Sequence, residues 1–117
     1  MKRDIDLIRK ILLEIEASPE PNRWINLDLK GYSPTQVSYH VKLLAEADLI
    51  EAENVSSTTN FEWKPKCLTW EGHEFLEASR DEGLWEKAKS LILGKGGTLS
   101  FDVLRQVLIE LIKGQVF

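Results

Sequence analysis

The side chains best suited to metal or nucleophilic chemistry are few in this sequence and stand apart from one another. His40, His73 and Cys67 are the ligands that a zinc site would use, but none of them has a partner at the short spacing of a metal-binding motif. A Cys67 nucleophile would need a histidine base and a third group to orient that base, and no such group is suggested. We therefore predict no metal site, no cofactor and no catalytic residue.

Other groups with catalytic potential have a simpler interpretation. Glu71, Glu74 and Glu77 lie along one predicted helix as a solvated face, not as a converging acid–base pair. Residues 94–97, Gly-Lys-Gly-Gly, lack the spacing of a phosphate-binding loop and are interpreted as a turn. The sequence predicts that the protein is not an enzyme.

Polar and basic side chains on a capped helix and on the following hairpin indicate a different chemistry. On a recognition helix the first residues reach base edges, and nearby lysines contact phosphates. The candidate DNA-contacting residues are Thr35, Gln36, Ser38, Tyr39, Lys42, Lys64 and Lys66. Alternatively, the helix residues form a solvated face and the hairpin lysines protect an edge strand from aggregation. Glu51, Glu53 and Glu62 dilute the positive charge of the same hairpin.

Composition limits how such a site works. The chain has 117 residues, of which 43% are hydrophobic, enough for one core. Residues 1–70 carry 9 basic and 11 acidic side chains and the remainder 6 and 8, so each part has a net charge of −2. Phosphate neutralisation supplies most non-specific DNA affinity, so this balance argues against a binder that depends on bulk charge.

The N-terminus has no signal-peptide pattern, no apolar run reaches the about 18 residues of a membrane span, and one cysteine forms no internal disulfide. We expect a cytoplasmic protein that does not bind membranes.

Local patterns predict the elements that position these residues. Apolar residues at helical spacing predict a helix over residues 4–16, and alternation predicts a short strand over residues 24–29. Ser33, Pro34 and Gln36 form a capping box that starts a helix reaching about residue 47. Val37, Val41 and Leu44 form its buried stripe.

The second half of the chain begins with a predicted hairpin, with strands over residues 49–53 and 61–68 and a polar tip at 57–60. Helices follow over residues 70–80, 84–93 and 101–113, the first capped by Thr69 and the last by Ser100. The four tryptophans are interpreted as core or core-rim anchors. The alternative is a partner-binding patch around Phe61 and Trp63.

Two segments resemble known signatures. Residues 37–50, Val-Ser-Tyr-His-Val-Lys-Leu-Leu-Ala-Glu-Ala-Asp-Leu-Ile, resemble the recognition helix of bacterial winged-helix repressors. Residues 68–76, Leu-Thr-Trp-Glu-Gly-His-Glu-Phe-Leu, resemble the helix that follows the wing in those proteins. The resemblance implies an α+β winged-helix fold and DNA binding. The sequence departs from the repressor pattern at two places. Residues 26–32 leave room for only one turn of the helix that normally precedes the recognition helix, and Asp48 replaces the glycine that usually ends the recognition helix.

The whole chain also resembles a family of small bacterial and phage proteins, the YjcQ-like domains of unknown function. The residues that carry this resemblance are 2–12, 31–32, 39–44, 68–76 and 96–97. It implies a winged helix, often of prophage or mobile-element origin, and no assigned activity.

The last predicted helix is apolar on more than one face. Phe101, Leu104, Leu108 and Leu111 form one seam. Val103, Val107 and Ile112 form a second, with Ile109 nearby. So wide an apolar face predicts a homodimer through the first seam. The alternative is a terminal helix that lies in a groove of its own domain.

Together these patterns predict one domain over residues 1–117, with a winged-helix core at 1–80 and a helical extension at 84–113. The predicted function is a small non-enzymatic regulatory module that binds double-stranded DNA as a dimer. The alternative is a winged helix that binds a protein partner and no DNA.

Overall fold

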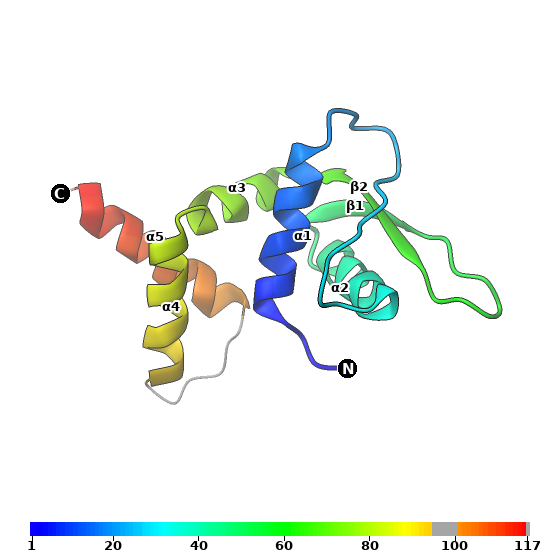
Figure 1. The fold of residues 1–117 in the computed structure, drawn as a ribbon. Helices are drawn as coiled ribbons and strands as arrows, with labels where there is room; N and C mark the ends of the chain where they lie inside the picture. Colours follow the sequence, from blue (N-terminus) through cyan, green and yellow to red (C-terminus); the bar gives the residue numbers. More distant parts are fainter. Residues whose placement is uncertain (95–100, 117) are drawn as a thin grey trace. The chain divides into compact units, whose positions relative to one another are not determined.

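A computed structural model of the chain describes residues 1–94 and 101–116 (Figure 1). In this part of the chain the fold is α+β, with five helices and a two-stranded antiparallel sheet. The elements are α1 Ile5–Ala17, α2 Pro34–Glu46, β1 Ile50–Asn54, β2 Trp63–Leu68, α3 Trp70–Ser79, α4 Glu82–Gly94 and α5 Phe101–Val116. The chain forms two compact units, Met1–His73 and Glu74–Phe117, with the boundary inside α3, whereas the sequence suggested a junction at 80–84. The predicted cap at Ser100, the glycines at 96–97 and the Phe101 side chain lie outside what the structure describes.

The first unit is built on α1, whose boundaries follow the predicted helix within a residue. Asp4 caps it, and the Asp4 side chain accepts a hydrogen bond from the Leu7 N–H at 3.1 Å. The apolar stripe of the helix is buried and consists of Ile5, Leu7, Ile8, Ile11, Leu12 and Ile15. Each such side chain contributes about 1.5–3 kcal/mol when removed from water, so this stripe is a large source of the unit's stability.

Helix α2 begins as its capping residues predict. The Ser33 side chain accepts from the Gln36 N–H at 3.1 Å, and Val37, Val41 and Leu44 are buried. The helix ends at Glu46 with Ala47 as its C-cap, and the next residue, Asp48, has a left-handed φ of 62°, the conformation that the usual glycine adopts readily. This residue turns the chain directly into β1.

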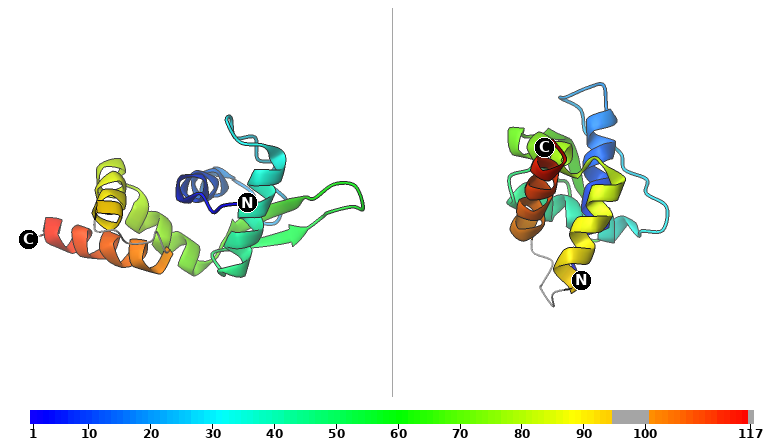
Figure 2. Two further views of the ribbon diagram at one scale, coloured as in Figure 1. Left: turned by 90° about the horizontal axis from the view of Figure 1, so that it is seen from below. Right: turned by 90° about the vertical axis from the view of Figure 1, so that its left-hand side faces the viewer.

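The predicted hairpin is confirmed. β1 pairs antiparallel with β2, and a Ser57 N–H to Asn60 carbonyl bond of 2.8 Å closes the tip where the polar loop was expected. Glu51 pairs with Cys67 and Ala52 with Pro65, so Lys66 is the extra residue of a β-bulge. Figure 2 shows the hairpin projecting beyond α2.

The predicted strand at residues 24–29 is wrong. The side chains of this segment do alternate, with Ile25, Leu27 and Leu29 half-buried between exposed neighbours. One backbone bond joins it to the sheet, from the Ile25 N–H to the Pro65 carbonyl at 2.9 Å. Because Pro65 has no N–H to return, the paired exchange that builds an antiparallel ladder cannot form there.

The segment before α2 contains a single turn, closed by the Tyr32 N–H and the Leu29 carbonyl at 3.3 Å. Gly31 adopts a φ of 89° in this turn. Residues 18–33 therefore hold no positioning helix, in agreement with the short spacing in the sequence.

The second unit contains the later part of α3 together with α4 and α5. Asp81 caps α4 by accepting from the Leu84 N–H at 2.9 Å. Phe75 meets Trp85 edge-to-face with ring centroids 6.2 Å apart. α4 packs on α5 (Figure 2), and their buried residues are Leu84, Trp85, Ala88, Ile92, Leu104 and Leu108. None of the described helices is long and apolar enough to cross a membrane.

The tryptophans divide between core and surface. Trp85 is a core anchor with 1% of its surface exposed, as predicted. Trp24 and Trp70 are 47% and 76% exposed, so their assignment to the core or its rim is wrong. Trp24 follows the turn at residues 21–22 and Trp70 is the first residue of α3, positions where local hydrophobicity does not determine which side the chain presents to the core.

Candidate nucleic-acid interface

The first turns of α2 present three of the predicted contact residues. Thr35 is exposed, and Gln36 and Tyr39 are half-buried. The Tyr39 ring stands edge-on to the His40 ring, with centroids 5.8 Å apart. These side chains offer hydroxyl and amide groups that can bond base edges or phosphates.

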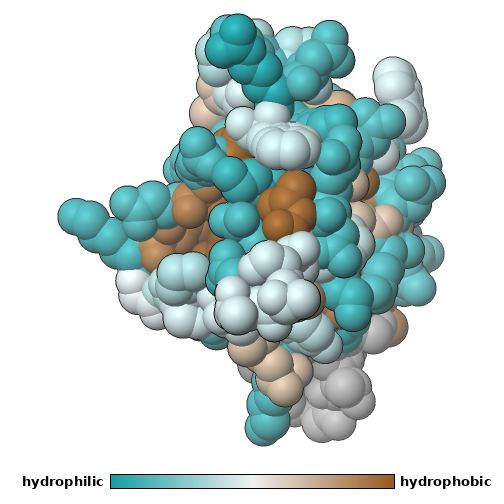
Figure 3. All heavy atoms as spheres, turned by 90° about the vertical axis from the view of Figure 1, so that its right-hand side faces the viewer, coloured by the Kyte–Doolittle hydropathy of each residue, from teal (hydrophilic) through white to brown (hydrophobic). Residues whose placement is uncertain are grey.

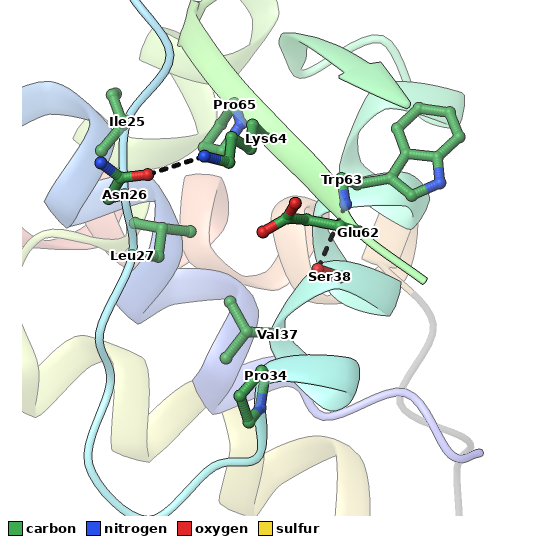
Figure 4. A pocket seen from close by; sticks show the side chains of 10 residues that line it. All are labelled: Ile25, Asn26, Leu27, Pro34, Val37, Ser38, Glu62, Trp63, Lys64 and Pro65. Atoms are coloured by element: carbon green, nitrogen blue, oxygen red, sulfur yellow. Dashed lines mark hydrogen bonds between the residues drawn. The ribbon is translucent and has the colours of Figure 1, made fainter. Parts of the chain in front are cut away.

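Ser38 is not part of this surface, which corrects the sequence prediction. It is 7% exposed, and its Oγ accepts a hydrogen bond from the Trp63 N–H at 3.2 Å (Figure 4). Position 38 follows Val37 and lies three residues before Val41, so it borders the buried stripe and meets β2. Ser38 therefore joins α2 to the hairpin.

His40 has a positioning role that the sequence analysis missed. It is fully buried, its Nδ1 donates to the Gln36 carbonyl at 2.8 Å, and its Nε2 accepts from the Asp4 N–H at 2.8 Å. These partners require the neutral ring with its proton on Nδ1. The Nε2 bond joins the start of α1 to α2, and the Nδ1 bond lies within α2, so neither nitrogen is available to a metal. The sequence does contain a signal for its burial, because position 40 lies three residues after Val37 and four before Leu44 and so falls on the buried stripe of the helix.

The three lysines of the predicted interface are all engaged. Lys42 lies 3.7 Å from Glu46, and Lys66 forms an ion pair with Glu53. Lys64 donates to Asn26 at 2.9 Å and lies 5.9 Å from the centre of the Trp24 ring.

Breaking such contacts costs little, because exposed ion pairs contribute at most about 1 kcal/mol. The Glu46 and Glu53 carboxylates nevertheless offset the charges of Lys42 and Lys66. A DNA complex at this face would depend on groups that recognise base edges more than on charge.

A small pocket lies beside this surface, in the first unit. It holds about 100 Å³ between residues 25–27, the start of α2 and β2 (Figure 4). The Glu62 carboxylate points into the space between Leu27 and Ser38. Lys64 also lines this pocket, so the Glu62 carboxylate offsets the only lysine charge among its lining residues and weakens any attraction for a phosphate.

Cys67 lies in β2 as predicted, opposite Glu51 of β1. Its thiol donates to Glu51 Oε2 at 2.9 Å. This hydrogen bond, assisted by partial burial and by the negative charge of Glu51, raises the pKa of Cys67 to about 11. The protonated thiol is a poor nucleophile.

Apolar surface on the side that carries the hairpin tip occurs in separate patches between hydrophilic side chains (Figure 3). Phe61 is 39% exposed, whereas Trp63 is half-buried. The Trp63 Nε1 is buried and has no hydrogen-bond partner within residues 1–94 and 101–116. The hairpin thus presents Phe61 more than Trp63.

The first seam predicted for a dimer is largely internal, which corrects its proposed role. Leu104 and Leu108 have no exposed surface in a single copy, because α5 packs them against α4. Leu111 is half-buried. The second seam is more accessible, with Val103 46% exposed and Val107, Ile109 and Ile112 half-buried.

Comparison with known proteins identifies relatives along nearly the whole chain. Residues 2–98 match the family described as "Hypothetical protein (DUF2513)". A Haemophilus influenzae protein described as "Uncharacterized protein" is 42% identical over 108 residues, which cover 92% of each chain. No solved structure matches significantly. The family match does not support the YjcQ-like resemblance. It does agree with the broader expectation of a family without an assigned activity. The chain belongs to the DUF2513 family.

Proposed function

We propose that this protein is a non-enzymatic winged-helix regulator that binds double-stranded DNA through α2, with the β1–β2 hairpin as its wing. The order of elements supports the proposal, because a capped helix leads through a left-handed residue into a hairpin. A cytoplasmic location and a prophage or mobile-element origin belong to the same proposal.

The observation that carries it is the way α2 is held. The Asp4–His40 bond ties the helix to α1, and the Ser38–Trp63 bond ties it to β2. Thr35, Gln36 and Tyr39 therefore project from a helix whose orientation relative to the hairpin is determined by buried bonds. A helix that reads bases in the major groove needs such a rigid support for its first residues.

A protein-interaction function is the second candidate, and the lysine contacts favour it. Lys42 and Lys66 are each paired with a glutamate, and Trp24 is largely exposed beside Lys64. Exposed aromatic residues are enriched where proteins meet other proteins. In this alternative the hairpin and Trp24 bind a protein partner and α2 contacts no DNA.

A mobility-shift series at low salt tests the proposal, using genomic fragments from the source organism. Lys42→Glu is expected to weaken binding to all fragments, because it removes a phosphate contact. Gln36→Ala and Tyr39→Ala are expected to change the order of preference among fragments, by about 5- to 100-fold for the affected base pair.

Lys87→Glu is the matched control, because it reverses an exposed lysine on α4. It is expected to leave binding unchanged. Wild-type protein that binds none of the fragments would contradict the proposal and favour the protein-interaction function.

A further inference from the structure

The later part of α3 and one face of α5 form an open groove in the second unit. Ala78 of α3 and Ile109 and Ile112 of α5 provide its apolar floor, and the groove holds about 310 Å³. Arg105, Ile109 and Ile112 share one face of α5 because they follow the i, i+4, i+7 spacing of a helix. This face is distinct from the Leu104 and Leu108 stripe, which is already buried.

The two sides of the groove carry opposite charges. Glu74 and Glu77 come from α3, where Glu77 also forms an exposed ion pair with Arg80, whereas Arg105 and Lys113 come from α5. An extended peptide of one charge would be attracted by one side and repelled by the other. A surface with both charges in separate rows is instead complementary to itself after a two-fold rotation.

We propose that this groove binds a second copy of the chain, as a two-fold symmetric dimer. The α3 side of each copy faces the α5 side of the other, so Glu74 and Glu77 of one protomer lie against the basic row of its partner. Ile109 and Ile112 of the two copies meet at the centre, where burial of their apolar surface favours association. The interface replaces the predicted Leu104–Leu108 seam and is independent of DNA binding by the first unit.

Sedimentation equilibrium of the full chain measures the assembly directly. The wild type is expected to be dimeric at high micromolar concentration. Ile109→Glu places a carboxylate in the apolar floor and is expected to shift the protein to monomer. Leu91→Glu is the matched control, because Leu91 is an apolar residue of α4 that is 39% exposed and lies outside the groove, and it is expected to leave the dimer intact.

Charge reversal separates lost association from lost folding. Glu74→Lys with Glu77→Lys makes both sides of the groove basic, and Arg105→Glu with Lys113→Glu makes both sides acidic. Each double variant alone is expected to be monomeric because like charges face each other across the axis. An equimolar mixture of the two is expected to dimerise, since every facing pair is then opposite in sign.

Several results would overturn the proposal. A wild type that is monomeric at high micromolar concentration would do so directly. A dimer that survives Ile109→Glu would show that another surface is used. Two double variants that stay monomeric when mixed, while circular dichroism shows both folded, would also overturn it.

Discussion

At the scale of single residues, one buried imidazole holds the N-terminus of the chain on the proposed recognition helix. His40 has no exposed surface, and its two ring nitrogens bond main-chain groups of Gln36 and Asp4. Because one nitrogen must donate and the other accept, no aliphatic side chain can replace it. Its position beside Tyr39 also connects the core to the exposed face of α2.

Replacing His40 with alanine is expected to destabilise the protein by about 2–4 kcal/mol, because the substitution opens a cavity and leaves the Asp4 N–H unbonded. Urea unfolding followed by circular dichroism measures the change. His73→Ala is the matched control, since His73 is exposed, and its effect is expected to stay within about 0.5 kcal/mol. Equal effects of the two substitutions would contradict the structural role assigned to the buried His40 hydrogen bonds.

The pKa of Cys67, raised to about 11 by the hydrogen bond to Glu51, predicts slow alkylation at neutral pH. Raising the pKa favours the protonated thiol, so the rate of reaction with iodoacetamide is expected to increase with pH until about 11. Glu51→Gln removes the charged acceptor and is expected to move this profile to lower pH. A wild-type profile with its midpoint near pH 9 or below would show that the hydrogen bond does not control the thiol.

At the scale of elements, the start of α3 approaches the end of α2 very closely. A Cβ atom at Gly72 would overlap the carbonyl oxygen of Leu49. The same junction is held by the Thr69 side chain, which donates to the Asp48 carbonyl at 2.7 Å and accepts from the Gly72 N–H at 3.1 Å. The Leu-Thr-x-x-Gly segment that resembles repressors therefore has a physical explanation here, a capping threonine followed by a residue without a side chain.

Gly72→Ala is expected to cost about 3 kcal/mol of stability, because main-chain atoms must move to remove the overlap. Thermal or urea unfolding checks this value. Gly114→Ala is the matched control, since a Cβ there meets nothing within 4 Å and alanine favours the helix by up to about 1 kcal/mol. The two substitutions thus have opposite expected signs, and a neutral Gly72→Ala would contradict the close approach.

At the scale of the whole molecule, charge determines how the protein would meet DNA. The net charge is −4, and two of the three lysines near α2 and the hairpin, Lys42 and Lys66, are paired with glutamates. Long-range attraction to DNA is therefore weak. Under the proposed function, recognition would therefore come from short-range contacts made by α2, with few released counterions.

The salt dependence of DNA binding tests this view. If Lys42, Lys64 and Lys66 are the phosphate contacts, the slope of log K against log salt concentration is expected to be about −3 or shallower. Lys42→Glu should make it less steep by about one, whereas Lys87→Glu should not change it. A slope much steeper than −4 would show that further cationic residues contact the DNA.

What the sequence by itself determined is the set of elements with strong local signals. The caps at Ser33 and Thr69, the apolar stripe of α2 and the polar hairpin tip depend on residues within a few positions of one another. Such features follow from helical and strand periodicity, which the amino-acid order states directly.

The tertiary structure alone decided which polar residues remain at the surface and which become buried supports. Ser38 bonds a residue 25 positions away, His40 one 36 positions away, and Lys64 one 38 positions away. The burial of Leu104 and Leu108 likewise depends on α4. Local periodicity cannot reveal these partners, because they meet only when separate segments pack and water is excluded between them. For the same reason, the sequence could not show that residues 24–29 form no strand. That outcome depends on Pro65, the distant residue of β2 that this segment meets and that has no N–H to donate.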